Sequence, residues 1–245
     1  PALRQAGCTI DTVSLSAEND FDFWVDEILA ATKEETDLVL LANPGNPTGI
    51  GIDPKQLSTL AGKLGDCRLL VDEAFVDFCP QRSVLSQVTQ FSNLLVLRSM
   101  TKFYAIPGVR VGYLAGAATD VARLATEKEP WTLSTLAISA AKACLVSEGY
   151  REQTLTLIPQ LRVELQQGLE SLGIKVFAGE ANYLLCYLPT TTPSAIAVRD
   201  SLQQQGLLVR ACDDFTPLDE RYLRVAVLGT ESNRYLLTAL EQLLK

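Results

Sequence analysis

Three short apolar runs, each ended by a polar motif, constrain the fold of this chain more than any other feature. They lie in "TDLVLLANP" (residues 36–44), "RLLVDEAF" (68–75) and "LLVLRSM" (94–100). Short apolar runs of this kind are typical of strands that are covered on both faces. Between the first two runs, "DPKQLSTLAGKLG" (53–65) predicts a helix with Asp53 as N-cap, Pro54 at its first position and Gly65 as its stop. This alternation predicts an α/β fold with a largely parallel sheet.

The rest of the chain divides into a first part that continues this alternation and a second part of different character. In the first part we expect strands at 9–15 and 110–116 and a helix at 23–32. After residue 119 we expect helices at 120–128, 134–149 and 150–173, with Pro159 either kinking the last of these or lying near a boundary. The tail predicts strands at 174–179, 182–189, 207–212 and 221–228 and helices at 193–206 and 230–244. The expected organisation is a large domain over residues 1–145, then an interdomain helix and a small α+β domain over 146–245.

The charge and the apolar pattern exclude two classes of partner. The net charge is −8, so the chain has no basic surplus for binding nucleic acid or an anionic membrane surface. No apolar run approaches the roughly 20 residues of a membrane span. The first residues show no signal-peptide pattern, and the six cysteines are scattered without a C-x-x-C pair. We therefore expect reduced thiols, no metal framework and a cytoplasmic location.

The absence of histidine narrows the possible chemistry further. The sequence contains none. This excludes Ser-His-Asp hydrolysis, Cys-His proteolysis, H-E-x-x-H metal sites and any imidazole base. Any catalysis must therefore depend on Lys, carboxylates, Tyr, Cys or a cofactor.

Polar motifs follow each of the three apolar runs, at the sheet edge where open α/β sheets bind ligands. The first is "NPGNPTG" (43–49), which could also be a simple tight turn. The second is "VDEAF" (71–75), whose two carboxylates are either solvated or partly directed into a site. The third, "RSMTKFYAIPGVRVGY" (98–113), places Lys102 in apolar surroundings. An ammonium there is destabilised, which favours an amine able to form a Schiff base.

Together these motifs meet the requirements of one cofactor. Ser99, Thr101 and Arg110 supply two hydroxyls and a guanidinium, a suitable cradle for a phosphate dianion. A carboxylate at a neighbouring strand end can pair with a pyridinium nitrogen. A Schiff-base lysine, a pyridinium partner and a phosphate cradle are the requirements of pyridoxal 5'-phosphate.

The order "NPGNPTG … VDEAF … SMTK … GVRVGY" resembles the fold-type I pyridoxal-phosphate enzymes of the aminotransferase class I/II superfamily, over nearly the whole chain. The resemblance implies a three-layer large domain with a mostly parallel sheet, N-terminally incomplete, plus the small α+β domain, and a homodimer. It also implies a role for each of these residues: Lys102 as the Schiff-base lysine, Asp72 at the pyridine nitrogen, Asn46 at the ring hydroxyl, Ser99, Thr101 and Arg110 at the phosphate, Arg224 at the substrate carboxylate, and Asn182 lining the same cleft.

Within the superfamily the chain resembles most the threonine-phosphate decarboxylases of cobalamin synthesis. Phe75 stands where aminotransferases usually have Tyr, and this departure favours the decarboxylase branch over neutral drift. The expected reaction is decarboxylation of L-threonine O-3-phosphate to 1-aminopropan-2-ol phosphate. A histidinol-phosphate-type aminotransferase is the alternative, because the two reactions differ only in which bond at Cα is broken.

The resemblance also implies that an N-terminal portion of the enzyme is missing here. Three interpretations stay open: an intact enzyme seen in part, a fragment made by cloning or proteolysis, or a truncated, non-catalytic binding or assembly module that keeps the fold. A nucleotide-binding α/β domain is a weaker alternative, because no G-x-G-x-x-G follows any predicted strand.

Overall fold

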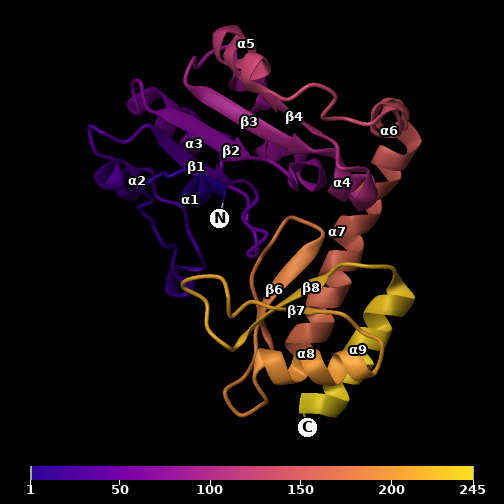
Figure 1. Ribbon diagram of the computed structural model, residues 1–245. Coiled ribbons are helices and arrows are strands. Elements are labelled where there is room, and N and C mark those ends of the chain that lie inside the picture. Colours follow the sequence, from indigo (N-terminus) through magenta and orange to yellow (C-terminus); the bar gives the residue numbers. More distant parts are fainter. Residues whose placement is uncertain (1, 245) are drawn as a thin grey trace.

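The larger of two β-sheets in this protein contains all three apolar runs of the first half. In the computed structural model, which describes residues 2–244, the runs form adjacent parallel strands, and a fourth strand joins them antiparallel (Figure 1). The strand order is β1 (Leu38–Ala42), β2 (Arg68–Asp72), β3 (Leu94–Ser99) and β4 (Gly112–Ala115). The prediction of an α/β fold with a mostly parallel sheet is confirmed.

One face of this sheet packs against α3 (Pro54–Lys63), the helix predicted between the first two strands. Leu57 and Leu60 of α3 belong to the same buried cluster as Leu69 and Val71 of β2. Burying each leucine contributes roughly 1.5–3 kcal/mol relative to leaving it exposed. Apolar packing therefore fixes the helix to the sheet.

The ends of α3 follow the sequence signals. Asp53 Oδ1 accepts a hydrogen bond from the Lys55 N–H at 2.8 Å, so the expected N-cap is formed. Gly65 follows the C-cap Leu64 and has a φ of 60°, a left-handed conformation that favours glycine.

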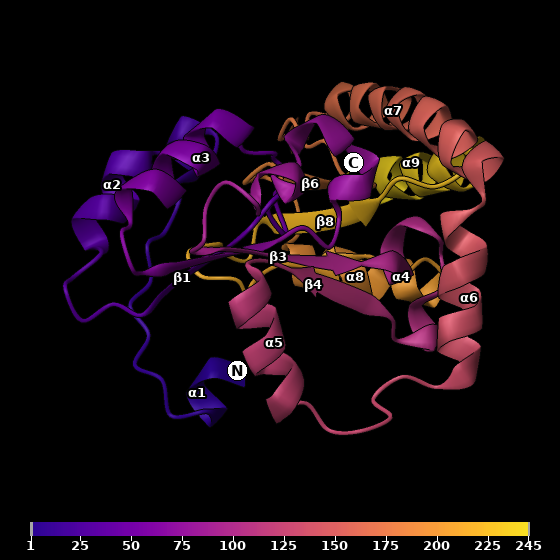
Figure 2. The same cartoon turned by 90° about the horizontal axis from the view of Figure 1, so that it is seen from above.

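Helices on both faces make the large sheet the middle of three layers. Seen from above, α2 (Val25–Ala31) and α3 lie on one side and α5 (Ala118–Glu127) lies on the other (Figure 2). An ion pair of 3.1 Å between Arg68 and Asp120 links α5 to β2. On the α5 side the cover is partial, since Leu40 of β1 is 52% exposed.

The second sheet is small and antiparallel. Its order is β5 (Lys175–Val176), β6 (Tyr183–Tyr187), β8 (Tyr222–Ala226) and β7 (Arg210–Ala211). It shares one buried cluster with α8 (Ala195–Gln204) and α9 (Thr230–Leu244). The predicted small α+β unit is confirmed.

A long helix, α7 (Glu148–Ser171), follows α6 (Thr135–Leu145) and runs from the large sheet to the small one (Figure 1). Leu161, Leu165 and Leu169 of α7 belong to the core of the small lobe. At the other end, the Tyr150 hydroxyl donates to the Phe103 carbonyl of α4 (Met100–Phe103) at 2.9 Å. The helix continues through Pro159, so of the two alternatives expected there the boundary is wrong and the kink stays a prediction. The domain division after residue 145 stays a prediction.

Two glycines meet where the lobes join. The Glu180 N–H donates to the Gly49 carbonyl at 2.7 Å, and Arg82 Nη2 lies 2.7 Å from Glu180 Oε1. A Cβ atom on Gly179 would lie only 3.0 Å from the Thr48 carbonyl oxygen, so these two segments of the chain approach each other closely. Hydrogen bonds and close packing therefore hold one lobe against the other.

The strand expected at residues 9–15 is wrong. This segment has no regular structure and is exposed except at Leu15, which is half-buried. A strand needs a neighbour to accept its backbone hydrogen bonds, and the described chain places none beside it. The remaining elements are α1 (Ala2–Gln5) and the short 3-10 turns Ala17–Asn19, Val76–Phe78, Pro80–Arg82, Leu85–Gln87 and Pro107–Val109. Among the helices of residues 2–244, none combines the length and the apolar character that crossing a bilayer requires.

Candidate active site

The carboxyl ends of β1, β2 and β3 lie side by side, so the three motifs that follow them meet at one edge of the large sheet. Ala42, Asp72 and Leu97 lie opposite one another in the register. The 43–49 loop, the Asp72–Phe75 segment and α4 begin within three residues of these positions. This edge is where open α/β sheets bind ligands.

The two asparagines of the 43–49 loop have different environments. Asn43 is buried; its Oδ1 accepts from the Ile52 N–H and its Nδ2 donates to the Arg82 carbonyl, both at 2.8 Å. Asn46 is exposed, and its Oδ1 accepts a hydrogen bond from Arg224 Nη1 at 2.5 Å. Asn43 therefore holds the loop, while the structure joins Asn46 to Arg224, a predicted site residue from the other lobe.

Lys102 lies in a cluster with the two predicted hydroxyls. Ser99 Oγ caps α4 by accepting from the Thr101 N–H and lies 2.8 Å from Thr101 Oγ1. Lys102 Nζ donates to Thr101 Oγ1 at 3.2 Å. The amine also lies 5.5 Å from the centroid of the Phe75 ring, within the range of a cation–π contact. Lys102 is half-buried, with an aromatic ring on one side and a hydroxyl on another.

The adjacent carboxylates Asp72 and Glu73 point to different partners. Asp72 is half-buried, and its Oδ1 accepts a hydrogen bond from the backbone two residues on, at 3.0 Å. Glu73 is fully buried and accepts hydrogen bonds from the Ser83 hydroxyl and the Val84 N–H at 2.7 Å and from Arg98 Nη1 at 2.9 Å. Burial raises the pKa of Glu73, and these donors offset the effect only in part. Glu73 therefore stabilises the interior of the large lobe. Asp72, at the carboxyl end of β2, is the one of the two carboxylates that is not buried there.

Arg110 and Asn182 are not joined to these groups. Arg110 is exposed, and its Nη1 donates to the Pro107 carbonyl at 3.4 Å rather than to Ser99 or Thr101. Asn182 Oδ1 is buried and has no hydrogen-bond partner in the described chain. Because such an acceptor costs roughly 1–3 kcal/mol when unpaired, a ligand donor there would stabilise it.

Two aromatic rings connect Lys102 to Arg224. The Phe75 and Tyr183 rings meet edge to face with centroids 4.9 Å apart. Arg224 Cζ lies 5.0 Å from the Tyr183 centroid, and the Tyr183 hydroxyl donates to the Gly45 carbonyl at 2.8 Å. Sequence reasoning missed Tyr183, because its partners lie far away in the chain and its only signal is an aromatic residue next to Asn182.

The residues present fit pyridoxal phosphate. An amine, two hydroxyls and a carboxylate at one sheet edge are the groups that the cofactor needs. What the arrangement can do chemically is to hold an anionic group beside an amine and to place a guanidinium from the small lobe near both.

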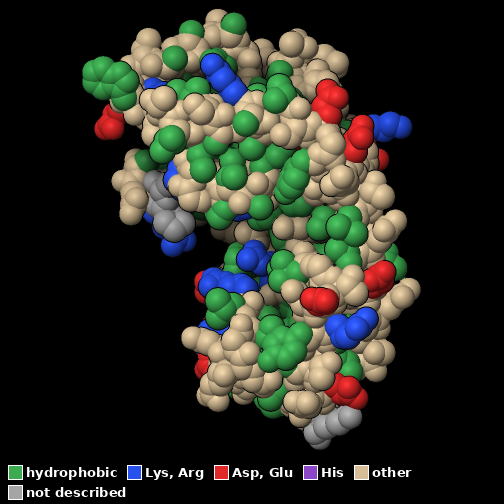
Figure 3. All heavy atoms as spheres, turned by 90° about the vertical axis from the view of Figure 1, so that its right-hand side faces the viewer, with side chains coloured by type: hydrophobic (Ala, Val, Ile, Leu, Met, Phe, Trp, Pro, Cys, Tyr) green, Lys and Arg blue, Asp and Glu red, His purple; other side chains and the backbone are tan. Residues whose placement is uncertain are grey.

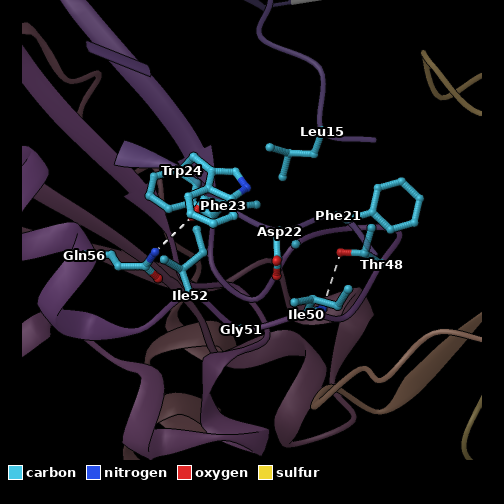
Figure 4. Close-up of a pocket in the computed structure, with 12 residues that line it drawn as sticks. Leu15, Phe21, Asp22, Phe23, Trp24, Thr48, Ile50, Gly51, Ile52 and Gln56 are labelled. Atoms are coloured by element: carbon cyan, nitrogen blue, oxygen red, sulfur yellow. Dashed lines mark hydrogen bonds between the residues drawn. The ribbon is translucent and has the colours of Figure 1, made fainter. Parts of the chain in front are cut away.

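The surface is hollowed where the two lobes meet, and a cavity lies close to the 43–49 loop. Figure 3 shows a hollow where the upper and lower lobes meet, bordered by Lys and Arg side chains. A cavity of about 180 Å³ lies nearby, where the 43–52 segment faces residues 21–24 (Figure 4). It shares Gly45 and Thr48 with the loop but contains none of the predicted site residues. The cavity is therefore a separate feature of the lobe junction.

Comparison with known proteins agrees with this geometry. The family model for aminotransferase class I and II matches residues 1–240. The chain is 34% identical to the threonine-phosphate decarboxylase of Salmonella typhimurium over 250 residues, covering 99% of this chain and 67% of the relative. It is 35% identical to a histidinol-phosphate aminotransferase of Mycobacterium bovis, covering 92% of this chain and 59% of the relative.

Solved structures give the same result. The histidinol-phosphate aminotransferase of Clostridium acetobutylicum aligns with a TM-score of 0.91 at 28% identity, covering 98% of this chain and 72% of that one. The chain spans 67% and 59% of the lengths of the two curated relatives above. By its sequence and its fold, the chain belongs to the aminotransferase class I and II family.

Proposed function

We propose that this chain is part of a pyridoxal-phosphate-dependent decarboxylase that converts L-threonine O-3-phosphate to 1-aminopropan-2-ol phosphate in cobalamin synthesis. The observation that carries the proposal is Phe75, whose ring lies between Lys102 and Tyr183. A phenylalanine there offers no hydroxyl to the cofactor, which is the departure from the aminotransferase pattern noted in the sequence. The 34% identity to a threonine-phosphate decarboxylase supports the same reaction.

Each predicted cofactor residue has a role in this proposal. When bound, pyridoxal phosphate supplies an electron-withdrawing ring that stabilises the negative charge left when a bond at Cα is broken. Lys102 would bind the cofactor covalently, and Asp72 would hold the proton of the pyridine nitrogen. Ser99 and Thr101 would hold the phosphate, and Asn46 would donate to the ring hydroxyl. Arg110 joins the phosphate only if its side chain turns away from Pro107.

Arg224 would orient the substrate by a paired interaction with its carboxylate. That contact would fix the orientation of the substrate, and so would select whether CO₂ or a proton leaves from Cα. Asn182 would line the same cleft, where its unpaired oxygen can accept from the substrate. A misplacement of about 1 Å can cost about a hundredfold in rate, so the exact position of Arg224 is decisive.

A histidinol-phosphate-type aminotransferase is the second candidate. The 35% identity to the Mycobacterium bovis enzyme and the TM-score of 0.91 with the Clostridium acetobutylicum structure favour it. We further propose a homodimer in the cytoplasm, on the resemblance to the superfamily and on the cysteine pattern.

The first test is covalent labelling. The purified chain is mixed with pyridoxal phosphate, reduced with borohydride and mapped by peptide mass. We expect the label on Lys102, its loss in Lys102→Ala and its retention in Lys55→Ala, a change of an exposed lysine on α3. Label spread over surface lysines would contradict the cofactor site and favour the non-catalytic module.

The second test separates the two reactions. L-Threonine O-3-phosphate is supplied, and both CO₂ and 2-oxo product are measured. Decarboxylation predicts CO₂ without oxo product. Oxo product with converted cofactor and no CO₂ would replace the decarboxylase by the aminotransferase.

A further inference from the structure

Tyr183 contacts Phe75, Gly45 and Arg224, which come from both lobes of the candidate site. It begins β6, and on the same sheet face it is the diagonal neighbour of Arg224, because Tyr183 pairs with Ala226 and Leu185 pairs with Arg224. The side chain is only 4% exposed. It therefore belongs to the small lobe but ends inside the junction with the large one.

The ring and the hydroxyl of Tyr183 have separate contacts. The ring lies under the Arg224 guanidinium at 5.0 Å and against the Phe75 ring at 4.9 Å. The hydroxyl donates to the Gly45 carbonyl at 2.8 Å, one residue before the Asn46 that receives Arg224. Burial raises the pKa of the Tyr183 phenol, so the hydroxyl stays a neutral donor near pH 7.

We propose that Tyr183 is a positioning residue that fixes the Arg224 guanidinium relative to Lys102. Its ring supports the guanidinium, and its hydroxyl ties β6 to the Gly45–Asn46 turn that receives the same guanidinium. Resting on the proposed function, Tyr183 thereby sets the orientation of the substrate carboxylate and the choice between losing CO₂ and losing a proton. It acts through Arg224.

Chemical modification of Arg224 tests the positioning without any substrate. Phenylglyoxal reacts with accessible guanidinium groups, and the rate at Arg224 is followed by peptide mass. Tyr183→Leu removes ring and hydroxyl, and we expect Arg224 to react about three- to tenfold faster. Tyr183→Phe keeps the ring, and we expect a smaller rise. Tyr187→Leu and Tyr187→Phe are the matched controls, because Tyr187 lies in the same strand and packs on Tyr222.

Kinetics test the consequence for the substrate. With L-threonine O-3-phosphate, Tyr183→Phe should lower kcat/KM about three- to tenfold, because the Arg224 guanidinium that binds the substrate carboxylate also orients it for reaction. This loss should vanish in an Arg224→Lys background, because Tyr183 acts through Arg224. Tyr183→Leu should also raise the ratio of 2-oxo product to CO₂.

The two proposals fail in different ways. Equal Arg224 modification rates in the Tyr183 and Tyr187 variants would overturn the positioning role, and so would an unchanged kcat/KM in Tyr183→Phe. If the unaltered protein forms neither CO₂ nor 2-oxo product from L-threonine O-3-phosphate, the proposed function fails, while the modification rates still decide the role of Tyr183. If Tyr183→Leu fails to fold, Tyr183→Phe remains, and an unchanged Arg224 modification rate in that variant would also overturn the role.

Discussion

Two carboxylates that are adjacent in the sequence, Asp72 and Glu73, have entirely different surroundings in the structure. Asp72 and Glu73 differ by one methylene group, yet Asp72 is half-buried and accepts from the Ala74 N–H while Glu73 is fully buried with Ser83 and Arg98. Removing one partner of such a buried pair typically costs 3–5 kcal/mol. The pair also fixes the ends of β2 and β3, and these strands carry Asp72 and the turn with Lys102. At this scale a structural carboxylate and the carboxylate proposed for the cofactor are neighbours in the sequence.

The buried thiols give a residue-scale prediction. Burial raises the pKa of Cys79 to about 12 and that of Cys212 to about 11, above the ordinary value of 9.0. The folded state therefore keeps these protons at a pH where the unfolded chain loses them. Their stabilising contribution is complete below pH 9 and is lost as the pH rises toward 11 and 12, by at most about 1.4 kcal/mol per thiol and pH unit.

The measurement is urea unfolding at pH 8, 9 and 10. Cys79→Ala should make the fall in unfolding free energy with pH less steep, whereas the exposed Cys8→Ala should leave the slope as it is. Identical slopes in both variants would show that Cys79 has the same pKa in the folded and the unfolded protein.

At the scale of elements, the sequence predicted what local patterns control. The strands β1 to β3 and the helix α3 follow from apolar runs and caps, and Ser99, Thr101 and Lys102 meet because they lie within four residues. The prediction of a strand at 9–15 was wrong because a strand depends on pairing with a neighbouring strand, which the local sequence does not determine. The contact between Asn46 and Arg224 spans 178 residues. Only the packing of the two lobes brings it about, so spacing could not predict it.

The N-cap of α3 is a second case of local control and gives the element-scale prediction. Asp53→Ala removes the acceptor for the Lys55 N–H and should lower the free energy of unfolding by about 1 kcal/mol, within a range of about 0.5–2. Asp53→Asn keeps an oxygen in place and should cost almost nothing. Urea denaturation of the two variants measures this, and equal losses would mean that the charge of Asp53, rather than its cap, stabilises the helix.

At the scale of the whole molecule, the lobes are held together by backbone that approaches closely. Gly179 has little room for a side chain, because its Cβ would lie 3.0 Å from the Thr48 carbonyl oxygen and 3.2 Å from Gly49 Cα. The same segment holds Glu180, which pairs with Arg82 across the junction. The relative position of the two lobes is therefore fixed at a few points where backbone of one lobe packs directly against backbone of the other.

Gly179→Ala should force this junction apart and destabilise the protein by roughly 1–3 kcal/mol, as overpacking does. Gly149→Ala is the control, because nothing lies within 4 Å of a Cβ at that position. The two melting temperatures, with Arg224 modification as a readout of the junction, are the measurement. A Gly179→Ala protein as stable as the control would mean that the loops separate at no cost.

The helix α7 connects the small lobe mechanically to the segment that carries Lys102. Its last turns lie in the core of the small lobe, and its first turn is bonded to the segment that carries Lys102. A helix of 24 residues is about 36 Å long, so a tilt of one degree about its lower end moves its upper end by about 0.6 Å. Displacements of that size are the ones that decide which bond of a substrate is aligned for breaking. Through the length of α7, a rotation of the small lobe by about one degree would therefore shift the segment that carries Lys102 by a distance that matters for the reaction.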